Sequence, residues 1–396
     1  MKVLVTAISF SSKMSGIQRH AFNLVRCLLL QNEVSRVDLV IAPWQQEMVK
    51  NAGVPWDSRL GVRVARVGAG SISRNLWHFR SLPGLATRMQ PDVVHLTYPV
   101  PIDADRLRVP VVLTLHDLYP YEIPSNFGLA RAIVNRMTLR QCLQSVDAIA
   151  CVSDSTQRCL KRVAPGHISG KAVRIYNCVE TVAPMTEKLP LSELHGKRFL
   201  LCVAQHRRNK NITLLLRSFS NLLRQGSIHA STCLLIVGIQ GPETTYIRKL
   251  VADRSLSGHI LFRDGLPDSQ LQWCYENCEA LVVPSKTEGF GLPVAEGLLA
   301  GSRVICSKIP ALLEIGGDHC RYFELGKAEE QDLANSIATS LGHPKPGAIA
   351  MPQLGPEVVG NAYLALYRQV IERRFAGAAS PSGRNELRDG SALREA

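Results

Sequence analysis

Aromatic residues are scarce in this chain of 396 residues, where Phe, Trp and Tyr together make up 6%. Surfaces that bind nucleic acid commonly stack bases on aromatic rings, so this composition argues against a nucleic-acid partner. The chain also has no apolar run near the roughly 18 residues that cross a bilayer. Its apolar start, Met1 to Ile8, is short and predicts a β-strand rather than a signal peptide. We therefore expect a cytoplasmic protein whose contact with a membrane is at most peripheral.

Motifs for common cofactors and metals are missing too. The sequence lacks the G-x-G-x-x-G fingerprint and the G-x4-G-K-S/T loop, which argues against dehydrogenases and P-loop enzymes. Its eleven cysteines are scattered, and the nearest pair, Cys274 and Cys278, has no common zinc or redox spacing. Asp103-Ala104-Asp105 has D-x-D spacing but lies in a polar loop of the first half. We predict reduced core cysteines, no bound metal and no cofactor.

The composition is globular, with a large positive charge. Apolar residues make up 46% and charged residues 20%, and the length suits two domains. The net charge is +13; residues 1–185 contain 22 Lys and Arg against 12 Asp and Glu, whereas residues 186–396 contain 24 against 21. A basic first half suits an anionic partner such as phosphate groups, acidic lipid headgroups or nucleic acid; alternatively it is simply a solvated surface.

Short β-branched runs alternate with helical patterns along the chain, which is typical of parallel α/β layers. The first half predicts strands at 3–7, 37–41, 93–96, 111–115 and 148–152 and helices at 17–30, 75–89, 129–144 and 155–163. The second half predicts strands at 199–203, 233–237, 260–262, 280–283 and 304–306 and helices at 212–223, 243–252, 269–276, 292–299, 332–341 and 357–375.

These patterns predict two doubly wound α/β domains joined by a linker. Residues 180–198 contain two prolines and no clear period, which indicates the linker. We expect Rossmann-like domains at 1–182 and 198–356, a final helix at 357–375 and a disordered tail at 376–396. Ligands of open parallel sheets bind beyond the carboxyl ends of the strands, so the site should lie in a cleft between the domains.

The most informative segment follows the apolar run 280–283 and reads PSKTEGFGLPVAEG over 284–297. Its two carboxylates, Glu288 and Glu296, flank a glycine loop that opens a predicted helix. Helix N-termini favour anions, and glycines let the backbone approach a phosphate closely. We predict that Glu288 lies near a sugar hydroxyl and Glu296 near a ribose, unless the first only caps the helix and the second is solvated. The phosphate groups of a ligand would bind the backbone of this loop, at Gly289, Phe290, Gly291 and Leu292.

The longer segment PSKTEGFGLPVAEGLLAGSRVICSKIPALLEIGG resembles the E-x7-E signature of retaining GT-B glycosyltransferases, specifically glycosyltransferase family 4. The resemblance covers residues 1–375 and is most specific over 280–317. It implies two Rossmann-like domains that face a central cleft, with the C-terminal helix packed back on the first domain. It also implies that the second domain binds a nucleotide diphosphate sugar and that the first domain receives the acceptor.

A basic segment after the first strand of the second half fits this resemblance. It reads QHRRNKN over 205–211, and cations beside a strand end suit a diphosphate leaving group. The family usually carries Lys followed by Asn here, which matches Lys210 and the residue after it. Many relatives have an Arg five or six residues earlier, where this chain has Gln205 and the alanine before it. Arg207 or Arg208 is expected to substitute, unless the segment is a plain exposed turn.

Four further positions match the family. Gly16 lies in SGIQR, which resembles the loop over the donor phosphate and sugar but also suits an ordinary turn. His116 ends an apolar strand, where relatives carry a His beside the transferred sugar; a structural hydrogen-bond donor is the alternative. Gly238 follows a strand and would line the nucleotide pocket. Leu266 belongs to RDGL, which resembles the segment whose backbone meets the base.

The resemblance implies a retaining, metal-independent enzyme that moves a mannose-type or glucose-type hexose. The acceptor would be a glycan or a polyprenyl-diphosphate-linked glycan for a bacterial surface polysaccharide. The predicted catalytic residues are Glu288, Lys210 and His116. Two alternatives stay open. A GT-B-like nucleotide-sugar epimerase would need further acid/base carboxylates near the sugar. The other alternative is a nucleotide-sugar-binding protein with an inactive site.

The helical stretch at 129–144 carries Arg136 and Arg140 four residues apart, with apolar Ile133 and Met137 nearby. Such a face can lie on an anionic bilayer, where each Arg contributes about 1 kcal/mol. We therefore expect peripheral contact with the inner leaflet of the cytoplasmic membrane. The alternative is that the apolar side chains, which also include Leu129 and Leu143, face the core.

Overall fold

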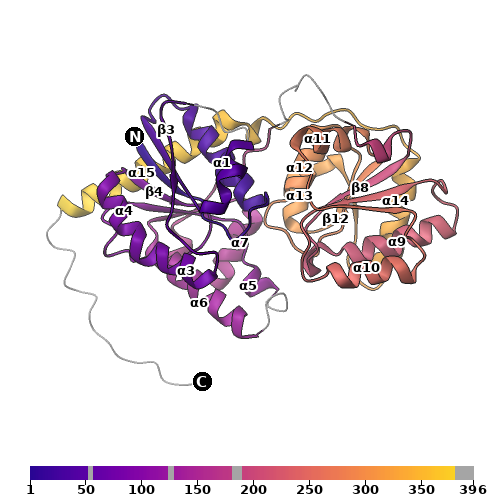
Figure 1. Ribbon diagram of the computed structural model, residues 1–396, viewed down its shortest axis with the longest axis horizontal. Helices are drawn as coiled ribbons and strands as arrows, with labels where there is room; N and C mark the ends of the chain where they lie inside the picture. Colours follow the sequence, from indigo (N-terminus) through magenta and orange to yellow (C-terminus); the bar gives the residue numbers. More distant parts are fainter. Residues whose placement is uncertain (52–56, 124–128, 181–189, 380–396) are drawn as a thin grey trace.

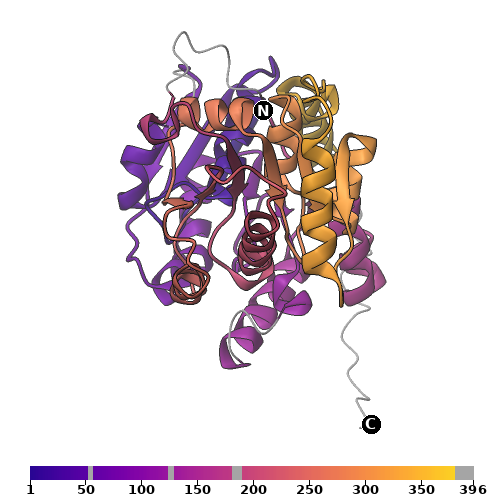
Figure 2. The same ribbon diagram turned by 90° about the vertical axis from the view of Figure 1, so that its right-hand side faces the viewer.

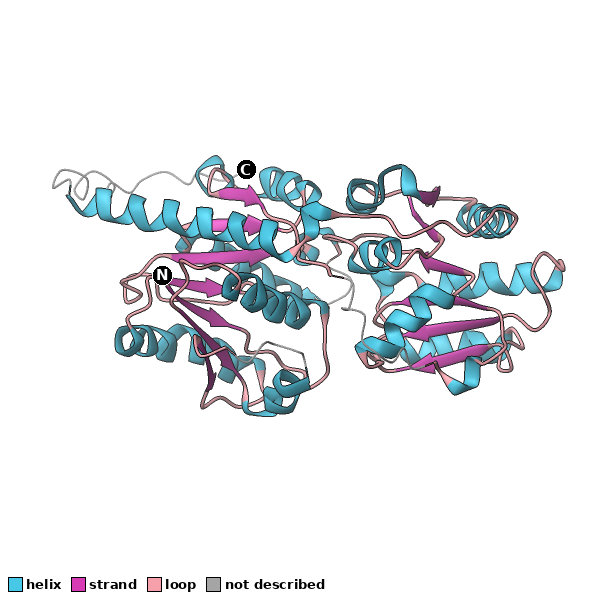
Figure 3. Cartoon of the chain, turned by 90° about the horizontal axis from the view of Figure 1, so that it is seen from above, coloured by secondary structure: helices cyan, strands magenta, loops and turns pink. Residues whose placement is uncertain are grey.

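The structure is a computed structural model that describes residues 1–51, 57–123, 129–180 and 190–379. Its strands form two separate parallel sheets, and each sheet has a hydrophobic core on both of its faces (Figures 1 and 3). Viewed along the line that joins them, the second domain stands in front of the first (Figure 2). This arrangement confirms the predicted fold class, α/β with two Rossmann-like domains.

The first sheet has seven strands in the order β3-β2-β1-β4-β5-β6-β7. Neighbouring residues of β1 enter opposite cores, Val3 and Val5 on one face and Leu4 on the other, because side chains alternate along a strand. Its strands are β1 (Lys2–Thr6), β2 (Arg36–Ile41), β3 (Leu60–Val64), β4 (Val93–Leu96), β5 (Val111–Leu115), β6 (Ala148–Cys151) and β7 (Ala172–Arg174). Its helices are α1 (Gly16–Leu29), α2 (Gln46–Asn51), α3 (Ser71–Leu76), α4 (Leu82–Met89), α5 (Tyr119–Glu122), α6 (Leu129–Ser145), α7 (Asp154–Val163) and α8 (Gly166–Ser169).

The second sheet has six strands in the order β10-β9-β8-β11-β12-β13. As in the first sheet, the order reverses beside the first strand, which places the following loops at a switch point where ligands bind. Its strands are β8 (Phe199–Val203), β9 (Cys233–Val237), β10 (Ile260–Arg263), β11 (Ala280–Val283), β12 (Val304–Ser307) and β13 (Cys320–Phe323). Its helices are α9 (Ile212–Arg224), α10 (Thr244–Asp253), α11 (Asp268–Asn277), α12 (Leu292–Leu299), α13 (Pro310–Gly316) and α14 (Glu329–Leu341).

The last helix, α15 (Pro356–Ala379), returns from the second domain and lies along the first (Figure 1). Its Tyr363 and Tyr367 side chains are fully buried in the core that β1 and α1 share. The Tyr363 hydroxyl lies 3.1 Å from Thr114 Oγ1, and the Tyr367 hydroxyl lies 2.7 Å from His95 Nδ1. α15 is therefore anchored in the interior of the first domain.

Three strands were not expected from the sequence, namely β3, β7 and β13, and each lies at the edge of its sheet. Edge strands bury fewer side chains, and β3 is mostly exposed, so these strands lack the apolar run that predicts a central strand. The expected helix at 75–89 is also interrupted. A π-helical turn, Trp77–Ser81, separates α3 from α4, whose second residue is Pro83. Proline has no N–H for the helical ladder, which explains the local change.

The segments without a clear period fall largely outside the described residues. Of the expected linker at 180–198, residues 181–189 are not described, and Ser192–Leu194 form a short 3-10 turn. Of the expected tail at 376–396, the last 17 residues are not described. α15 continues to Ala379, so the final helix ends four residues later than expected. The cysteines are free and buried except Cys320, which is partly exposed.

Candidate active site

Lys210 and Glu288 form the ion pair at the centre of the site. Lys210 ends the loop that follows β8, and Glu288 lies in the loop that follows β11. The Lys210 Nζ donates to both carboxylate oxygens of Glu288, at 2.6 and 2.7 Å, and the Ser285 hydroxyl donates to Glu288 Oε1 at 2.7 Å. The Glu288 side chain is 8% exposed and that of Lys210 is 19% exposed. A cation and a carboxylate are thus held at one point of the cleft.

The glycine loop after Glu288 lies against the first domain. A Cβ on Gly289 would stand 1.7 Å from the carbonyl oxygen of His116, so only glycine fits this contact. Gly291 caps α12 with a φ of 98°, a left-handed conformation that glycine adopts without strain. Within the described residues, the N–H groups of Phe290 and Gly291 donate no hydrogen bond. They remain able to bind an anion at the start of α12, the place predicted for the donor phosphates.

Glu296 is the fifth residue of α12 and lies among polar partners from both domains. The Tyr275 hydroxyl donates to Glu296 Oε2 at 2.6 Å. Burial raises the pKa of Glu296, while the nearby Arg19 of α1 opposes this rise. The Arg19 guanidinium donates to Asp268 at 2.7 Å. Arg19 therefore links the first turn of α1 to the carboxylate predicted to bind a ribose.

The first loop of the chain also borders the donor loop. A Cβ on Gly16 would lie 3.5 Å from Leu292 Cδ1, so the start of α1 touches the start of α12. Lys13 pairs with Asp264 at 2.8 Å, beside the segment that contains Leu266. Gly16 and Leu292, predicted from distant parts of the sequence, are thus brought together across the cleft.

His116 directly follows β5 at the cleft. Its Nε2 donates to the carbonyl oxygen of Thr97 at 2.9 Å, so the Nδ1 atom of the neutral ring can accept a hydrogen bond. Burial lowers the pKa of His116 to about 4, so the ring is neutral at pH 7. The ring also packs edge-on against His20, with the centroids 4.7 Å apart. His116 therefore suits a role as a neutral hydrogen-bonding group rather than as a cation.

Asp117 is a site residue that the sequence did not single out. Its Oδ1 accepts the N–H of Tyr119 at 3.1 Å, and its Cβ lies beside Gly289. Burial raises the pKa of Asp117 to about 6, with further effects from Glu122, Lys210 and Glu288. The sequence feature that could have identified it is its position directly after His116, at the end of a strand. Sequence alone could not show that this carboxyl group faces the Lys210–Glu288 pair.

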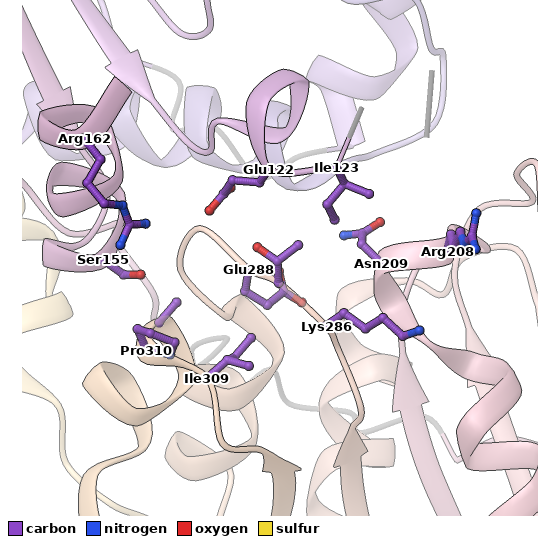
Figure 4. Close-up of a pocket in the computed structure, with 12 residues that line it drawn as sticks. Glu122, Ile123, Ser155, Arg162, Arg208, Asn209, Lys286, Glu288, Ile309 and Pro310 are labelled. Atoms are coloured by element: carbon purple, nitrogen blue, oxygen red, sulfur yellow. The ribbon is translucent and has the colours of Figure 1, made fainter. Parts of the chain in front are cut away.

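A cavity of about 500 Å³ opens between the two domains beside Glu288 (Figure 4). The first domain contributes Glu122 and Arg162, whose charged groups point toward the space around Glu288 in Figure 4. The second domain contributes the loop after β11 and the start of α13, with Pro310. Residues of both domains thus surround a space large enough for a sugar and part of an acceptor.

The remaining predicted donor residues lie at different distances from this cavity. Arg208 lines the cavity, whereas Arg207 lines a neighbouring one described below. Gly238 packs on the loop after β8, because a Cβ there would lie 2.0 Å from the carbonyl oxygen of Ala204. Leu266 is partly buried against the core of the second domain. The described part of the chain contains no group of three or more metal-ligating side chains.

Two further sets of hydrogen bonds join the two domains beside the cleft. Glu314 of α13 accepts the N–H groups of Asp154 and Ser155, at 2.7 and 2.9 Å, and so caps α7 of the other domain. Thr156 donates to the carbonyl oxygen of Gly289 at 3.1 Å. The motif EIGG contributes Glu314, so part of the predicted segment joins the domains.

Among the helices described, none is long and apolar enough to span a membrane.

Two family models match the chain. Residues 187–346 match the model described as Glycosyl transferases group 1, and residues 14–182 match the model described as Glycosyltransferase Family 4. Together they cover more than half of the sequence. The first match contains the Lys210–Glu288 pair and Glu296, and the second contains Gly16 and His116.

Curated relatives include two O-antigen enzymes. O-antigen chain mannosyltransferase B of Escherichia coli is 27% identical over 212 residues, which are 52% of this chain and 55% of the relative. O-antigen chain mannosyltransferase RfbU of Salmonella typhimurium is 26% identical over 205 residues, 51% of this chain and 53% of the relative. The aligned part spans about half the length of these relatives.

Solved structures share the whole architecture. HepE of Anabaena, in complex with UDP and glucose, has a TM-score of 0.63 at 15% identity and covers 96% of this chain and 99% of its own. WaaG, a glycosyltransferase involved in lipopolysaccharide biosynthesis, has a TM-score of 0.65 at 14% identity and covers 96% and 100%. At these identities the likeness shows the fold. The two family models together show that the chain is a glycosyltransferase of the family 4 type, and the solved structures show that it has the GT-B fold.

Proposed function

We propose that the protein transfers a hexose, mannose-type in preference to glucose-type, from a nucleotide diphosphate sugar to a glycan or lipid-linked acceptor. The observation that carries this proposal is the Lys210–Glu288 pair, which lies beside the start of α12 at the interdomain cavity. Its surroundings offer cations and N–H groups for phosphates and carboxylates for hydroxyl groups. The mannosyltransferase relatives support the choice of sugar, and the UDP-bound neighbour supports the choice of donor.

In this proposal the donor lies along α12. Glu296 binds the ribose hydroxyl groups in place of its contact with Tyr275. The diphosphate accepts hydrogen bonds from the N–H groups at the start of α12 and replaces Glu288 as the partner of Lys210. Glu288 then accepts hydroxyl groups of the transferred sugar, and His116 Nδ1 accepts another from the side of the first domain. Gly289 lets the loop that carries Glu288 pack closely against the loop that carries His116.

The proposed reaction retains the anomeric configuration. The bond between the anomeric carbon and the diphosphate oxygen breaks, and the acceptor oxygen bonds to the same face of that carbon. The acceptor proton passes to the departing phosphate oxygen. Lys210 stabilises the negative charge that grows on the diphosphate, an effect of roughly 2–4 kcal/mol per preorganised contact. The proposed enzyme is metal-independent and needs no cofactor besides its donor.

The acceptor is proposed to be lipid-linked and reached at a membrane surface. Ile133, Val134 and Met137 of α6 are 58%, 56% and 66% exposed, while Leu143 is buried. The core-facing alternative therefore fails for Ile133 and Met137 and holds for Leu143; the side chain of Leu129 is not described. α3 and the π-helical turn carry exposed apolar residues too, and α3 and α6 both lie at the lower edge of the first domain in Figure 1. We call these exposed residues the lower apolar face: Ile72, Leu76, Phe79, Ile133, Val134 and Met137.

The lower apolar face is accompanied by cations, as contact with anionic lipid requires. On α6, Arg136 lies between Val134 and Met137 and Arg140 follows Met137 by three residues, and Arg80 follows Phe79. Each cation near an anionic surface contributes about 1 kcal/mol. Inner-leaflet lipid-linked glycans carry acceptor hydroxyl groups close to such a surface. This placement supports a peripheral enzyme of surface-polysaccharide assembly.

The direct test is release of nucleotide diphosphate. The protein is incubated with UDP- and GDP-linked glucose and mannose, with and without lipid-linked glycan acceptors. We expect nucleotide release and a labelled acceptor with one donor and retention of configuration in the product by NMR. Interconversion of the sugar without transfer would instead establish the epimerase alternative. Tight nucleotide-sugar binding without turnover across a broad acceptor panel would indicate the inactive binding protein.

A further inference from the structure

A second cavity, of about 410 Å³, adjoins the cleft on the second domain. Its charged lining comprises one carboxylate, Glu243, and four cations, which are Arg207, Arg208, Arg217 and Lys286. Arg217 pairs with Glu330 at 3.2 Å. The other three cations form no salt bridge with any residue in the described ranges. Three cations without a salt bridge, against one carboxylate, give this cavity a net positive charge that attracts an anion.

Hydrogen-bond donors also lie beside this cavity. α9 begins at the cavity, where Ile212 and Thr213 form part of the lining, and its first N–H groups favour negative charge. Asn211, the residue before α9, also lines the cavity, and its side chain is 4% exposed. Its Nδ2 has no hydrogen-bond partner among the described residues. A buried amide donor beside three cations is the chemistry of a phosphate site.

Two of these cations, Arg207 and Arg208, were predicted from the sequence to bind the donor, but Lys210, Glu288 and Glu296 do not line the second cavity. Lys210 directs its ammonium at Glu288, and Glu296 and Tyr275 line neither cavity. In Figure 4, the Lys286 side chain extends away from Glu288, to the side on which Arg208 lies. Both residues nevertheless line the first cavity as well as the second. One molecule can therefore place a hydroxyl group near Glu288 and a phosphate among these cations.

We propose that the second cavity is a subsite for a phosphate or diphosphate group of the acceptor, distinct from the place of the donor's diphosphate. This inference rests on the proposed transferase function and adds the acceptor chemistry that the cleft recognises. The position agrees with a lipid-linked molecule, because α10, which borders this cavity, and α6 lie along the same lower edge in Figure 1. The phosphate joins sugar to lipid, so it belongs between the cleft and the membrane-facing edge.

The test is a calorimetric titration of the full chain with inorganic pyrophosphate, alone and with saturating UDP or GDP, whichever binds. We expect pyrophosphate to bind in both conditions. Lys286→Gln and, separately, Arg207→Gln should weaken this binding roughly tenfold. Lys249→Gln, an exposed lysine of α10 outside the cavity lining, should leave it unchanged. Pyrophosphate that the nucleotide displaces would mark the donor's own phosphate site and overturn the proposal. Absent binding, or binding that neither cavity variant weakens, would indicate an adventitious ion only and overturn it too.

Kinetics distinguish an acceptor phosphate from free phosphate. With a short-chain prenyl-diphosphate-linked sugar as acceptor, Lys286→Gln should raise the acceptor KM roughly tenfold with little change in kcat. With a phosphate-free alkyl glycoside, the acceptor KM should stay the same. Equal effects on both acceptors would overturn the acceptor assignment. If neither UDP nor GDP binds, the transferase proposal fails, whereas the titration with pyrophosphate alone still decides whether the cavity binds an anion.

Discussion

The ammonium of Lys210 donates to both carboxylate oxygens of Glu288, although 78 residues separate the two in sequence. The pair joins the loops that follow β8 and β11, neighbouring strands of the second sheet. In the proposed reaction, a diphosphate that enters the cleft competes with Glu288 for the same cation. Donor binding would thereby free the carboxylate for the sugar hydroxyl groups.

Lys210→Ala should lower kcat about 100-fold while the donor KM changes much less, because the charge it meets grows in the transition state. Steady-state kinetics at saturating acceptor measure the effect. Lys249→Ala, at an exposed position of α10, is the matched control and should behave like the wild type. A kcat within twofold of the wild type in Lys210→Ala would exclude the assigned role.

Substitutions of the two carboxylates, Glu288 and Glu296, should differ in their effect on nucleotide binding. Glu296→Gln should weaken the affinity for nucleotide diphosphate about tenfold, because an amide accepts the ribose hydroxyl groups less strongly than a carboxylate. Glu288→Gln should retain nucleotide affinity and lose turnover, because it is placed at the sugar. Calorimetry with UDP and GDP gives the affinities. Equal losses of nucleotide affinity in both variants would contradict this division of roles.

Transfer should not require a divalent metal. Lys210 and the N–H groups at the start of α12 lie where a metal would otherwise neutralise the diphosphate. We expect the initial rate to stay within twofold of its untreated value after dialysis against excess EDTA. A rate that falls to background with EDTA and returns on addition of Mn²⁺ or Mg²⁺ would refute metal independence.

The stability of the fold should depend on pH through Asp117. Burial raises the pKa of Asp117 to about 6, above its value of about 3.8 in an unfolded chain. The folded state therefore binds the proton more tightly. Ionisation of Asp117 lowers the free energy of unfolding progressively between about pH 4 and pH 6, and the full loss is present above pH 6. Asp117→Asn should raise the free energy of unfolding by about 1–2 kcal/mol at pH 8 and by little at pH 4.

Thermal and urea unfolding at several pH values measure this difference. Asp105→Asn removes an exposed carboxylate of the same domain and serves as the control, with no comparable pH-dependent gain expected. If Asp117→Asn were less stable than the wild type at pH 8, the ionised carboxylate would instead be a favourable partner of Lys210.

The lower apolar face should bind anionic liposomes. We expect the protein to float with vesicles that contain an anionic lipid, to bind less at high salt, and to remain unbound with neutral vesicles. Arg136→Glu with Arg140→Glu should abolish flotation, and Met137→Gln should weaken it, because Met137 is 66% exposed. Arg224→Glu, an exposed change on α9, is the control. Protein that stays soluble with anionic vesicles at low salt would disprove the membrane contact and leave the sugar chemistry untouched.

Local patterns predicted the central part of the fold well. The expected strands at 93–96, 111–115, 199–203, 233–237 and 280–283 match the observed ones, because each is a short buried apolar run between polar turns. The start of α12 was predictable as well, since Gly291 and Pro293 mark it in sequence. Three of the four edge strands, β3, β7 and β13, and the interrupted helix before β4 were missed, because their burial and hydrogen bonding depend on neighbouring segments.

The sequence by itself determined the α/β class, the likeness to family 4 and the residues that carry chemistry within single loops, such as Glu288 and Lys210. Only the tertiary structure decided which of these meet. It directed Lys210 at Glu288, placed the partly buried Asp117 beside Gly289 and brought Arg19 near Glu296. The reason is physical: the direction of a loop side chain and its pKa are set by packing and burial against segments far away in sequence, which no local pattern contains.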